Sequence, residues 1–140
     1  IEIENLFQQK TLRYSQANDE NIQNTKTLII DSIGLLASIY QYSDIALVGG
    51  GFTGALHNIL EPASFGNVVL FGPKHQKFHE AGELISLEGA FSISTNDDFN
   101  KKIELIHANL NQYKINSKNF ISINKGATNR IFDILNNYGK

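Results

Sequence analysis

Short apolar runs rich in β-branched residues alternate with segments of helical periodicity along the middle of this 140-residue chain. Runs of four or five apolar residues are typical of strands that are buried on both faces of a sheet. Helices between such strands favour parallel βαβ units with right-handed crossovers. The alternation therefore predicts an α/β fold, a doubly wound parallel sheet with helices on both faces.

The expected elements cover most of the chain. Strands are predicted over residues 11–14, 27–31, 45–48, 68–71 and 90–93, and the strand at 27–31 is expected to be buried on both faces. Helices are predicted over residues 1–7, 34–42, 58–65, 78–87, from 96 to 110, and over 124–137. We expect the polar residues 15–25 to form a loop and the polar residues 114–119 to break a helix. The length predicts one domain, residues 1–140.

Composition excludes several classes of protein. A hydrophobic fraction of 41% and a charged fraction of 19% are typical of a folded, soluble chain. A net charge of −2 argues against nucleic acid as a partner, and the absence of cysteine excludes disulfides and cysteine-based metal sites. No apolar stretch is long enough to span a bilayer. The predicted helix at residues 1–7 has no capping residue before it, so we expect the chain to be truncated at its N-terminus.

A glycine-rich segment follows the strand at 45–48. Gly49, Gly51 and Gly54 fit the pattern G-x-G-x-x-G, in which glycines let the backbone approach a phosphate closely. A dinucleotide site also needs an uninterrupted helix and an acidic residue about 20 residues further on. Pro62 interrupts the helix and the next strand ends in Phe-Gly-Pro, so both conditions fail. The segment is either a phosphate-binding loop or a plain tight turn.

The sequence His-Asn-Ile-Leu-Glu-Pro-Ala at residues 57–63 marks a helix start. Proline is tolerated only in the first turn, so Pro62 places the start within about four residues before it. The free N–H groups of Asn58 to Glu61 would then suit a phosphate, and the Glu61 carboxylate would suit sugar hydroxyls. The alternative is that Asn58 only caps the helix and Glu61 only complements its dipole.

A third loop follows the strand at 27–31 and contains Asp31, Ser32, Ile33, Gly34 and Leu35. The apolar side chains of Ile33 and Leu35 could pack against a flat base, and Ser32 could cap the following helix. The alternative is an ordinary helix start with no ligand.

Together these segments carry a resemblance to a known family. Residues 31–93, with the glycine loop, the HNILEPA helix, the FGP turn and the segment Glu-Gly-Ala-Phe at 88–91, resemble the C-terminal half of the 3-deoxy-D-manno-octulosonic acid (Kdo) transferases. The resemblance continues weakly at residues 125–128. These transferases are GT-B glycosyltransferases of lipopolysaccharide assembly.

The resemblance implies a Rossmann-like donor-binding domain of an enzyme that moves Kdo from CMP-Kdo to a lipid A precursor with inversion, and without a metal or other cofactor. The donor-binding residues that it implies are Ile33, Gly34, Leu35, Gly50, Gly51, Asn58, Ile59, Leu60 and Glu61. Leu35 stands where many members have glutamate, which removes a polar contact. The general base, the acceptor site and a membrane anchor are expected in a preceding domain, at the cytoplasmic face of the bacterial inner membrane.

Other charged residues leave alternatives open. Lys74 and Lys77 could steady a departing phosphate, or could form a solvated loop together with His75. His75 and His79 have a spacing that can bind zinc, as do His57 and Glu61, but no third ligand follows at a recognisable spacing, so we expect no metal.

No residue suits a general base, so this chain alone is expected to be inactive. An uncovered sheet edge or apolar helix face would favour self-association. The alternatives to a Kdo transferase domain are another GT-B nucleotide-sugar transferase or epimerase domain, and a nucleotide-binding module without chemistry.

Overall fold

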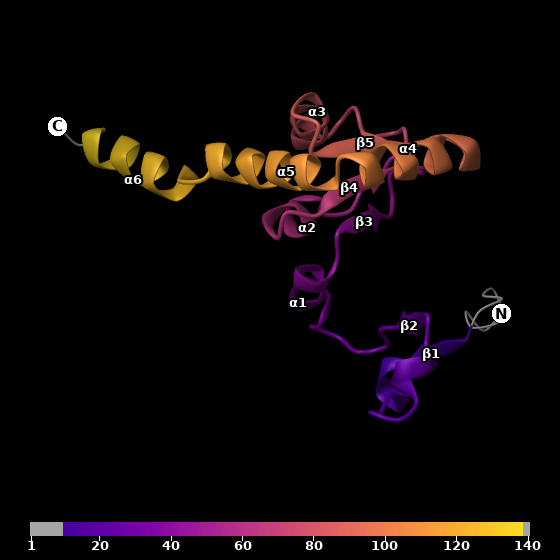
Figure 1. Ribbon diagram of the computed structural model, residues 1–140. Coiled ribbons are helices and arrows are strands. Elements are labelled where there is room, and N and C mark those ends of the chain that lie inside the picture. Colours follow the sequence, from indigo (N-terminus) through magenta and orange to yellow (C-terminus); the bar gives the residue numbers. More distant parts are fainter. Residues whose placement is uncertain (1–9, 139–140) are drawn as a thin grey trace. The chain divides into compact units, whose positions relative to one another are not determined.

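The computed structural model describes residues 10–138, which fall into two compact units (Figure 1). The first unit ends at Ile39 and the second begins at Tyr40. The helix predicted over residues 1–7 lies outside the described residues.

The first unit contains a two-stranded parallel sheet. Strand β1 (Thr11–Arg13) pairs with β2 (Thr27–Ile29), and two short 3-10 helices, η2 (Tyr14–Gln16) and η3 (Ile22–Asn24), interrupt the predicted loop. The prediction that the second strand is buried on both faces is wrong, because Leu28 is 38% exposed. Among the described residues β2 has a single partner strand, and so small a sheet buries little of its surface.

The helix predicted over residues 34–42 is shorter than expected. Helix α1 (Leu36–Ile39) has four residues and is followed by the 3-10 helix η4 (Tyr40–Tyr42). Gly34 has a φ of +90°, a left-handed conformation that a right-handed helix does not contain. The helix therefore begins after Gly34, and Ser32 is too far from its start to cap it.

The second unit is built on three parallel strands in the order β3 (Ile45–Val48), β4 (Val68–Phe71) and β5 (Ala90–Ser92). Val48 lies opposite Phe71, and Phe71 lies opposite Ser92, so the carboxyl ends of the strands share one edge of the sheet. All residues of β4 are buried. The strands predicted at 45–48, 68–71 and 90–93 are confirmed.

Helices cover both faces of this sheet, as predicted. Helices α2 (Leu60–Ser64), α3 (His79–Ser86) and α5 (Leu110–Asn124) pack on one face, whereas α4 (Asn96–Ala108) and the first turns of α5 pack on the other. The core on the first face includes Val48, Leu56, Ile59, Ala63, Val69, Phe71, Ala81, Leu84, Ala90 and Phe120. The core on the second face includes Val68, Leu70, Ile93, Ile106 and Tyr113. Alternate side chains of β4 serve the two cores.

The predicted break at residues 114–119 is wrong, because α5 runs through it without interruption. Tyr113, Ser117 and Phe120 are buried and recur at the spacing of one helix face. The Ser117 hydroxyl oxygen lies 2.7 Å from the Asn67 carbonyl oxygen and 3.0 Å from that of Gly89. A polar composition without glycine or proline does not end a helix whose inner face is buried and hydrogen-bonded.

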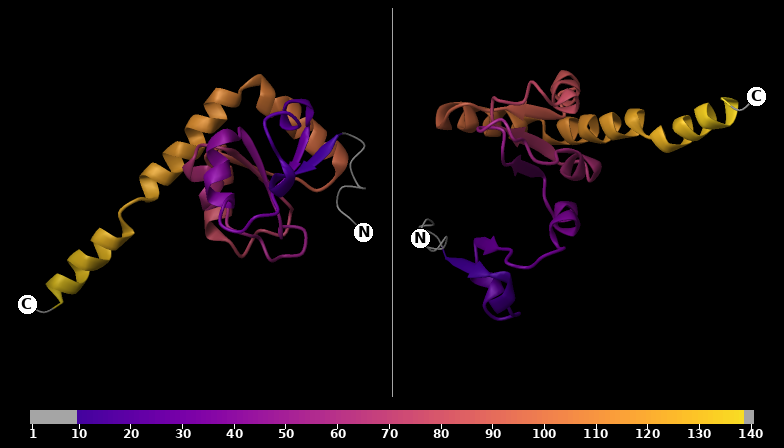
Figure 2. Two further views of the ribbon diagram at one scale, coloured as in Figure 1. Left: turned by 90° about the horizontal axis from the view of Figure 1, so that it is seen from below. Right: turned by 180° about the vertical axis from the view of Figure 1, so that it is seen from behind.

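Helix α6 (Ala127–Asn137) follows Gly126, which has a φ of +89°. Both views of Figure 2 show α6 extending beyond the end of α5, away from the three-stranded sheet. Ile131, Phe132 and Leu135 on α6 are each more than half exposed. An apolar helix surface therefore lies open to solvent.

Candidate functional site

Two loops meet at the carboxyl edge of the three-stranded sheet, where open α/β sheets bind their ligands. The glycine loop (residues 49–54) follows β3, and a second loop (residues 72–78) follows β4. The Lys74 backbone N–H donates to the Gly51 carbonyl oxygen at 2.8 Å. A Cβ atom on Gly51 would lie 2.6 Å from the Gly72 nitrogen, so the two backbones are in direct contact.

The glycine loop is a closed turn. The Gly50 carbonyl oxygen accepts the backbone N–H groups of Thr53, Gly54 and Ala55 at 3.0 to 3.1 Å. Gly50 and Gly54 have φ values of +82° and +90°, which favour glycine. The internal geometry of the turn therefore explains these glycines without a ligand, and the donor contacts of Gly50 and Gly51 stay a prediction.

The predicted helix at residues 58–65 is shorter than expected, because α2 contains the five residues Leu60–Ser64. Pro62 lies in its first turn, as predicted. The Asn58 side-chain oxygen accepts the Leu60 N–H at 3.0 Å, and the Asn58 side-chain nitrogen donates to Glu61 Oε1 at 2.9 Å. Asn58 therefore closes the start of the helix, and Glu61 is fixed beside it.

The side chains from Asn58 to Glu61 differ in their exposure to solvent. Asn58, Leu60 and Glu61 face solvent, whereas the Ile59 side chain is only 1% exposed and belongs to the core. Ile59 can therefore meet a ligand only through its backbone. Burial raises the pKa of the Tyr40 phenol, and the negative charge of Glu61 adds to this rise, so Tyr40 stays protonated at neutral pH.

His57 lies against the glycine loop. Its backbone N–H donates to the Gly49 carbonyl oxygen at 3.1 Å. Its ring lies beside Gly49, because a Cβ atom on that glycine would be 3.4 Å from Nδ1. These contacts agree with the predicted structural role of His57 in fixing the loop.

The loop predicted to contact the base lies in the first unit. The side chain of Ile33 is fully exposed, and a Cβ atom on Gly34 would meet nothing within 4 Å. Just before them, the Asp31 carboxylate accepts the Ser15 N–H at 3.0 Å and the Ser15 hydroxyl at 2.6 Å. These bonds, with a smaller contribution from Arg13, hold the pKa of Asp31 below its ordinary value.

The second unit brings together Gly50, Gly51 and the segment from Asn58 to Glu61. Ile33, Gly34 and Leu35 belong to the first unit.

The histidines considered for zinc have other contacts. His79 Nε2 lies 3.0 Å from Glu83 Oε1, and the His75 ring packs edge-on against Phe71. Within residues 10–138 no group of three or more His, Cys, Asp or Glu side chains could hold a metal ion.

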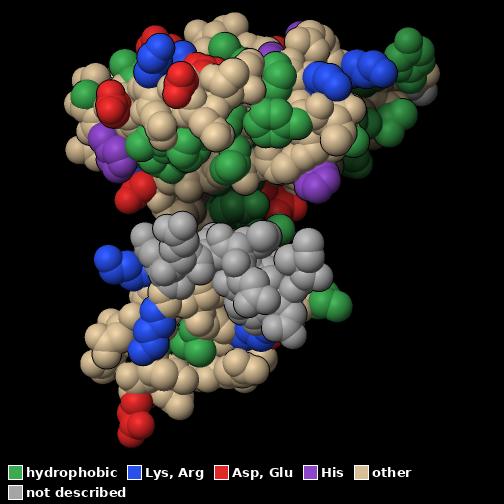
Figure 3. Space-filling model, turned by 90° about the vertical axis from the view of Figure 1, so that its right-hand side faces the viewer, with side chains coloured by type: hydrophobic (Ala, Val, Ile, Leu, Met, Phe, Trp, Pro, Cys, Tyr) green, Lys and Arg blue, Asp and Glu red, His purple; other side chains and the backbone are tan. Residues whose placement is uncertain are grey.

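In the same range no helix is both long and apolar enough to cross a bilayer. On the face drawn in Figure 3, basic and acidic side chains lie interspersed.

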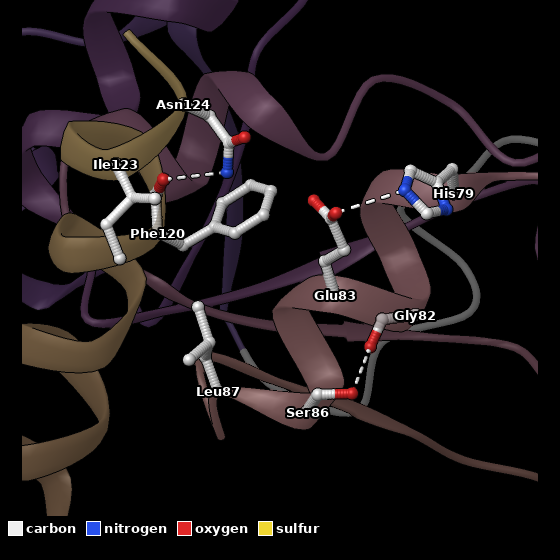
Figure 4. Close-up of a pocket in the computed structure, with 8 residues that line it drawn as sticks. All are labelled: His79, Gly82, Glu83, Ser86, Leu87, Phe120, Ile123 and Asn124. Atoms are coloured by element: carbon white, nitrogen blue, oxygen red, sulfur yellow. Dashed lines mark hydrogen bonds and ion pairs between the residues drawn. The ribbon is translucent and has the colours of Figure 1, made fainter.

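Sequence reasoning missed a groove of about 590 Å³ between α3 and α5 (Figure 4). Phe120, Ile123 and Leu87 supply its apolar surface, and the pair His79 and Glu83 lies at its rim. An adjoining hollow of about 340 Å³ extends it to Leu60 at the start of α2. The small residues Gly82 and Ser86 on α3 leave this space open. They are four residues apart and so share one face of the helix, which is the sequence signal that could have indicated the groove.

Comparison with known proteins bears on the family and the fold. No protein-family model matches the chain. A 3-deoxy-D-manno-octulosonic acid transferase of Haemophilus influenzae is 31% identical over 122 residues, which are 83% of this chain and 29% of that protein. The transferase of the same name from Rickettsia conorii is 27% identical over 127 residues, which are 86% of this chain and 27% of that protein. The chain is a relative of the Kdo transferases.

A third relative shows a different setting for the same kind of sequence. A bifunctional glycosyltransferase/methyltransferase of Fusobacterium nucleatum is 36% identical over 112 residues, which are 74% of this chain and 17% of that protein. The chain thus spans less than a third of the length of these curated relatives.

The solved structures agree with the sequence relatives. The C-terminal CMP-Kdo binding domain of WaaA from Acinetobacter baumannii superposes with a TM-score of 0.62, at 24% sequence identity. The match covers 81% of this chain and 61% of that domain. The predicted fold class, a Rossmann-like α/β domain of the GT-B type, is confirmed.

Proposed function

We propose that this chain is the donor-binding part of a Kdo transferase and that it binds CMP-Kdo. The observation that carries the proposal is the similarity to several Kdo transferases over 71–86% of the chain. The fold supports it, since the neighbour in the solved structures is a CMP-Kdo binding domain. In this reading the glycine loop and the segment from Asn58 to Glu61 hold the phosphate and ribose, and Ile33 to Leu35 contact the base.

The geometry of the second unit suits a nucleotide. The exposed Glu61 carboxylate is held by Asn58 through Oε1, and its second oxygen accepts no hydrogen bond from the described residues. A fixed carboxylate is a good acceptor for ribose hydroxyls. The loop contacts at Gly51 keep the nearby backbone rigid, so little ordering is needed when a ligand binds.

The chemistry of the whole enzyme extends this proposal. The acceptor is a lipid A precursor, the transfer inverts the anomeric carbon, and no metal takes part. A general base outside these residues deprotonates the acceptor hydroxyl. The complete protein works at the cytoplasmic face of the inner membrane. The exposed apolar side chains of α6 favour self-association of the chain.

A panel of nucleotides tests the proposal. Thermal unfolding of the chain is measured with CMP, UDP, NAD and ADP, because a ligand that binds the folded state raises the unfolding temperature. We expect CMP to give the largest rise. NMR signals of Ile33 to Leu35 and Asn58 to Glu61 should shift with CMP, and shifts confined to other loops would contradict the site.

The panel also separates the alternatives. A preference for UDP would indicate another GT-B nucleotide-sugar transferase or epimerase domain. The similarity to a bifunctional glycosyltransferase/methyltransferase favours a second setting, in which the same donor-binding part is joined to a methyltransferase. A nucleotide-binding module without chemistry would also bind CMP, and it is distinguished by the complete protein, which would then form no product from CMP-Kdo.

A further inference from the structure

We propose that the Lys74 side chain binds an anionic group of the donor that lies over the glycine loop. This inference rests on the proposed function, because it assigns a further residue to the same site. Lys74 lies on the loop that follows β4, and its position is fixed by its own backbone, whose N–H donates to the Gly51 carbonyl oxygen at 2.8 Å. A Cβ atom on Gly54 would lie 3.9 Å from the Cβ atom of Lys74. The stem of the lysine therefore starts beside the last glycine of the loop.

The charge of the candidate site gives the second step. Residues 49–54 carry no charged side chain, and between Asn58 and Glu61 the one charged side chain is the carboxylate of Glu61. A CMP-activated sugar acid carries a phosphate and a carboxylate, both negative. Without a cation, these residues would present a net negative charge to a dianionic ligand.

Lys74 supplies the missing cation. Its side chain is exposed, and within residues 10–138 no acidic side chain lies within ion-pair distance of its ammonium group. A lysine already paired with a carboxylate would have to exchange that partner for the ligand. Lys74 has no such cost, and its flexible stem lets one ammonium group reach either anionic group over the loop.

The loop that carries Lys74 is well ordered by its own contacts. His75 packs its ring against Phe71, Gln76 donates to the Pro73 carbonyl oxygen at 2.8 Å, and the Phe78 N–H donates to the His75 carbonyl oxygen at 2.9 Å. None of these contacts uses the Lys74 side chain. Lys74→Ala therefore removes the ammonium group and keeps the backbone bond to Gly51.

The test is titration of cytidine, CMP and CMP-Kdo into the full 140-residue chain at low salt. Affinities are measured by isothermal titration calorimetry or from NMR chemical-shift changes. The variants are Lys74→Ala, Lys74→Arg, and the control Lys101→Ala, which removes an equal charge from an exposed position on α4. We expect Lys74→Ala to weaken binding of the anionic ligands at least about fivefold, and Lys74→Arg to retain it. Cytidine affinity and the Lys101 variant should stay at the wild-type level.

The ligands distinguish the two anionic groups. A loss with both CMP and CMP-Kdo assigns Lys74 to the phosphate, and a loss with CMP-Kdo alone assigns it to the sugar carboxylate. Equal affinities of wild type and Lys74→Ala for both ligands would overturn the inference and leave the proposed function standing. A wild-type chain that binds neither ligand would overturn both.

Discussion

At the scale of single residues, the proposed site depends most directly on Glu61. We expect Glu61→Ala to lower CMP affinity, because a charge-assisted hydrogen bond to the ribose is worth roughly 1.5 to 3 kcal/mol. The change also removes the acceptor of the Asn58 side-chain N–H. Calorimetric titration with CMP measures the loss, and in the complete enzyme the donor KM or kcat should change as well.

A matched control for Glu61 is Glu104→Ala, since Glu104 is an exposed carboxylate on α4. This variant should bind CMP as the wild type does. Wild-type affinity in Glu61→Ala would show that Glu61 only supports the start of α2.

Two glycines should respond to alanine in opposite directions. A Cβ atom on Gly51 would lie 2.6 Å from the Gly72 nitrogen, so Gly51→Ala forces two backbones apart and should lower the free energy of unfolding by about 1 to 3 kcal/mol. A Cβ atom on Gly82 in α3 meets nothing within 4 Å, so Gly82→Ala should raise it by about 0.5 to 1 kcal/mol. Urea denaturation measures both. A neutral Gly51→Ala would mean that the loop relaxes freely.

Replacing Glu88 by glycine should stabilise the folded chain. Glu88 lies two residues after the end of α3 and has a φ of +54°, the one left-handed conformation of a non-glycine residue between residues 10 and 138. Its N–H and that of Gly89 bond to the last carbonyl groups of the helix, so the conformation is fixed. Glu88→Gly should raise the free energy of unfolding by about 1 kcal/mol. Glu88→Ala, which keeps the Cβ atom, should change it little, and equal effects would argue against backbone strain.

The turn and the helix start at the candidate site follow from the sequence, but the exposure of their side chains does not. The glycine pattern and Pro62 correctly placed a turn and a helix start after the strand at 45–48. Nothing in the local sequence distinguishes the core side chain of Ile59 from the exposed side chain of Leu60. That difference depends on where α2 packs against the sheet, which is tertiary information.

At the scale of elements, strands were more predictable than helices. The strands of the second unit are short, apolar and bounded by glycine or polar residues, so their positions follow from local pattern. Helix α5 continues through Ser117, whose buried hydroxyl lies within hydrogen-bond distance of the Asn67 and Gly89 carbonyl groups. A serine in a polar run gives no sign of such a role, which is why a break was predicted there.

The contact between Ser15 and the end of β2 should make the first unit sensitive to acid. The Asp31 pKa is lowered in the folded chain, so its contribution to stability is present above the ordinary aspartate range and is lost as the pH falls through the lowered value. The Ser15 amide signal in NMR should therefore titrate with a midpoint below the ordinary aspartate value. In Asp31→Asn this titration should disappear. A midpoint at or above the ordinary value would contradict the hydrogen bonds to Ser15.

At the scale of the whole molecule, all residues of the second unit that we propose to bind the donor lie at one edge of its sheet. The second unit offers a glycine loop, Glu61 and Lys74 at one edge of its sheet. His75, on the loop after β4, packs its ring against Phe71. We assign the general base to none of these residues, since Glu61 and Lys74 are proposed to bind the donor.

We therefore expect the 140-residue chain to transfer no Kdo by itself. Without a general base the acceptor hydroxyl is a poor nucleophile, and loss of that help typically costs about 10²- to 10⁴-fold in rate. Loss of acceptor positioning lowers the rate by further orders of magnitude. The measurement is product formation from CMP-Kdo and a lipid A precursor, compared with a reaction that lacks protein. Turnover above that background would mean that the catalytic base lies within these residues, and variants of His57, Glu61 and His75 would then identify it.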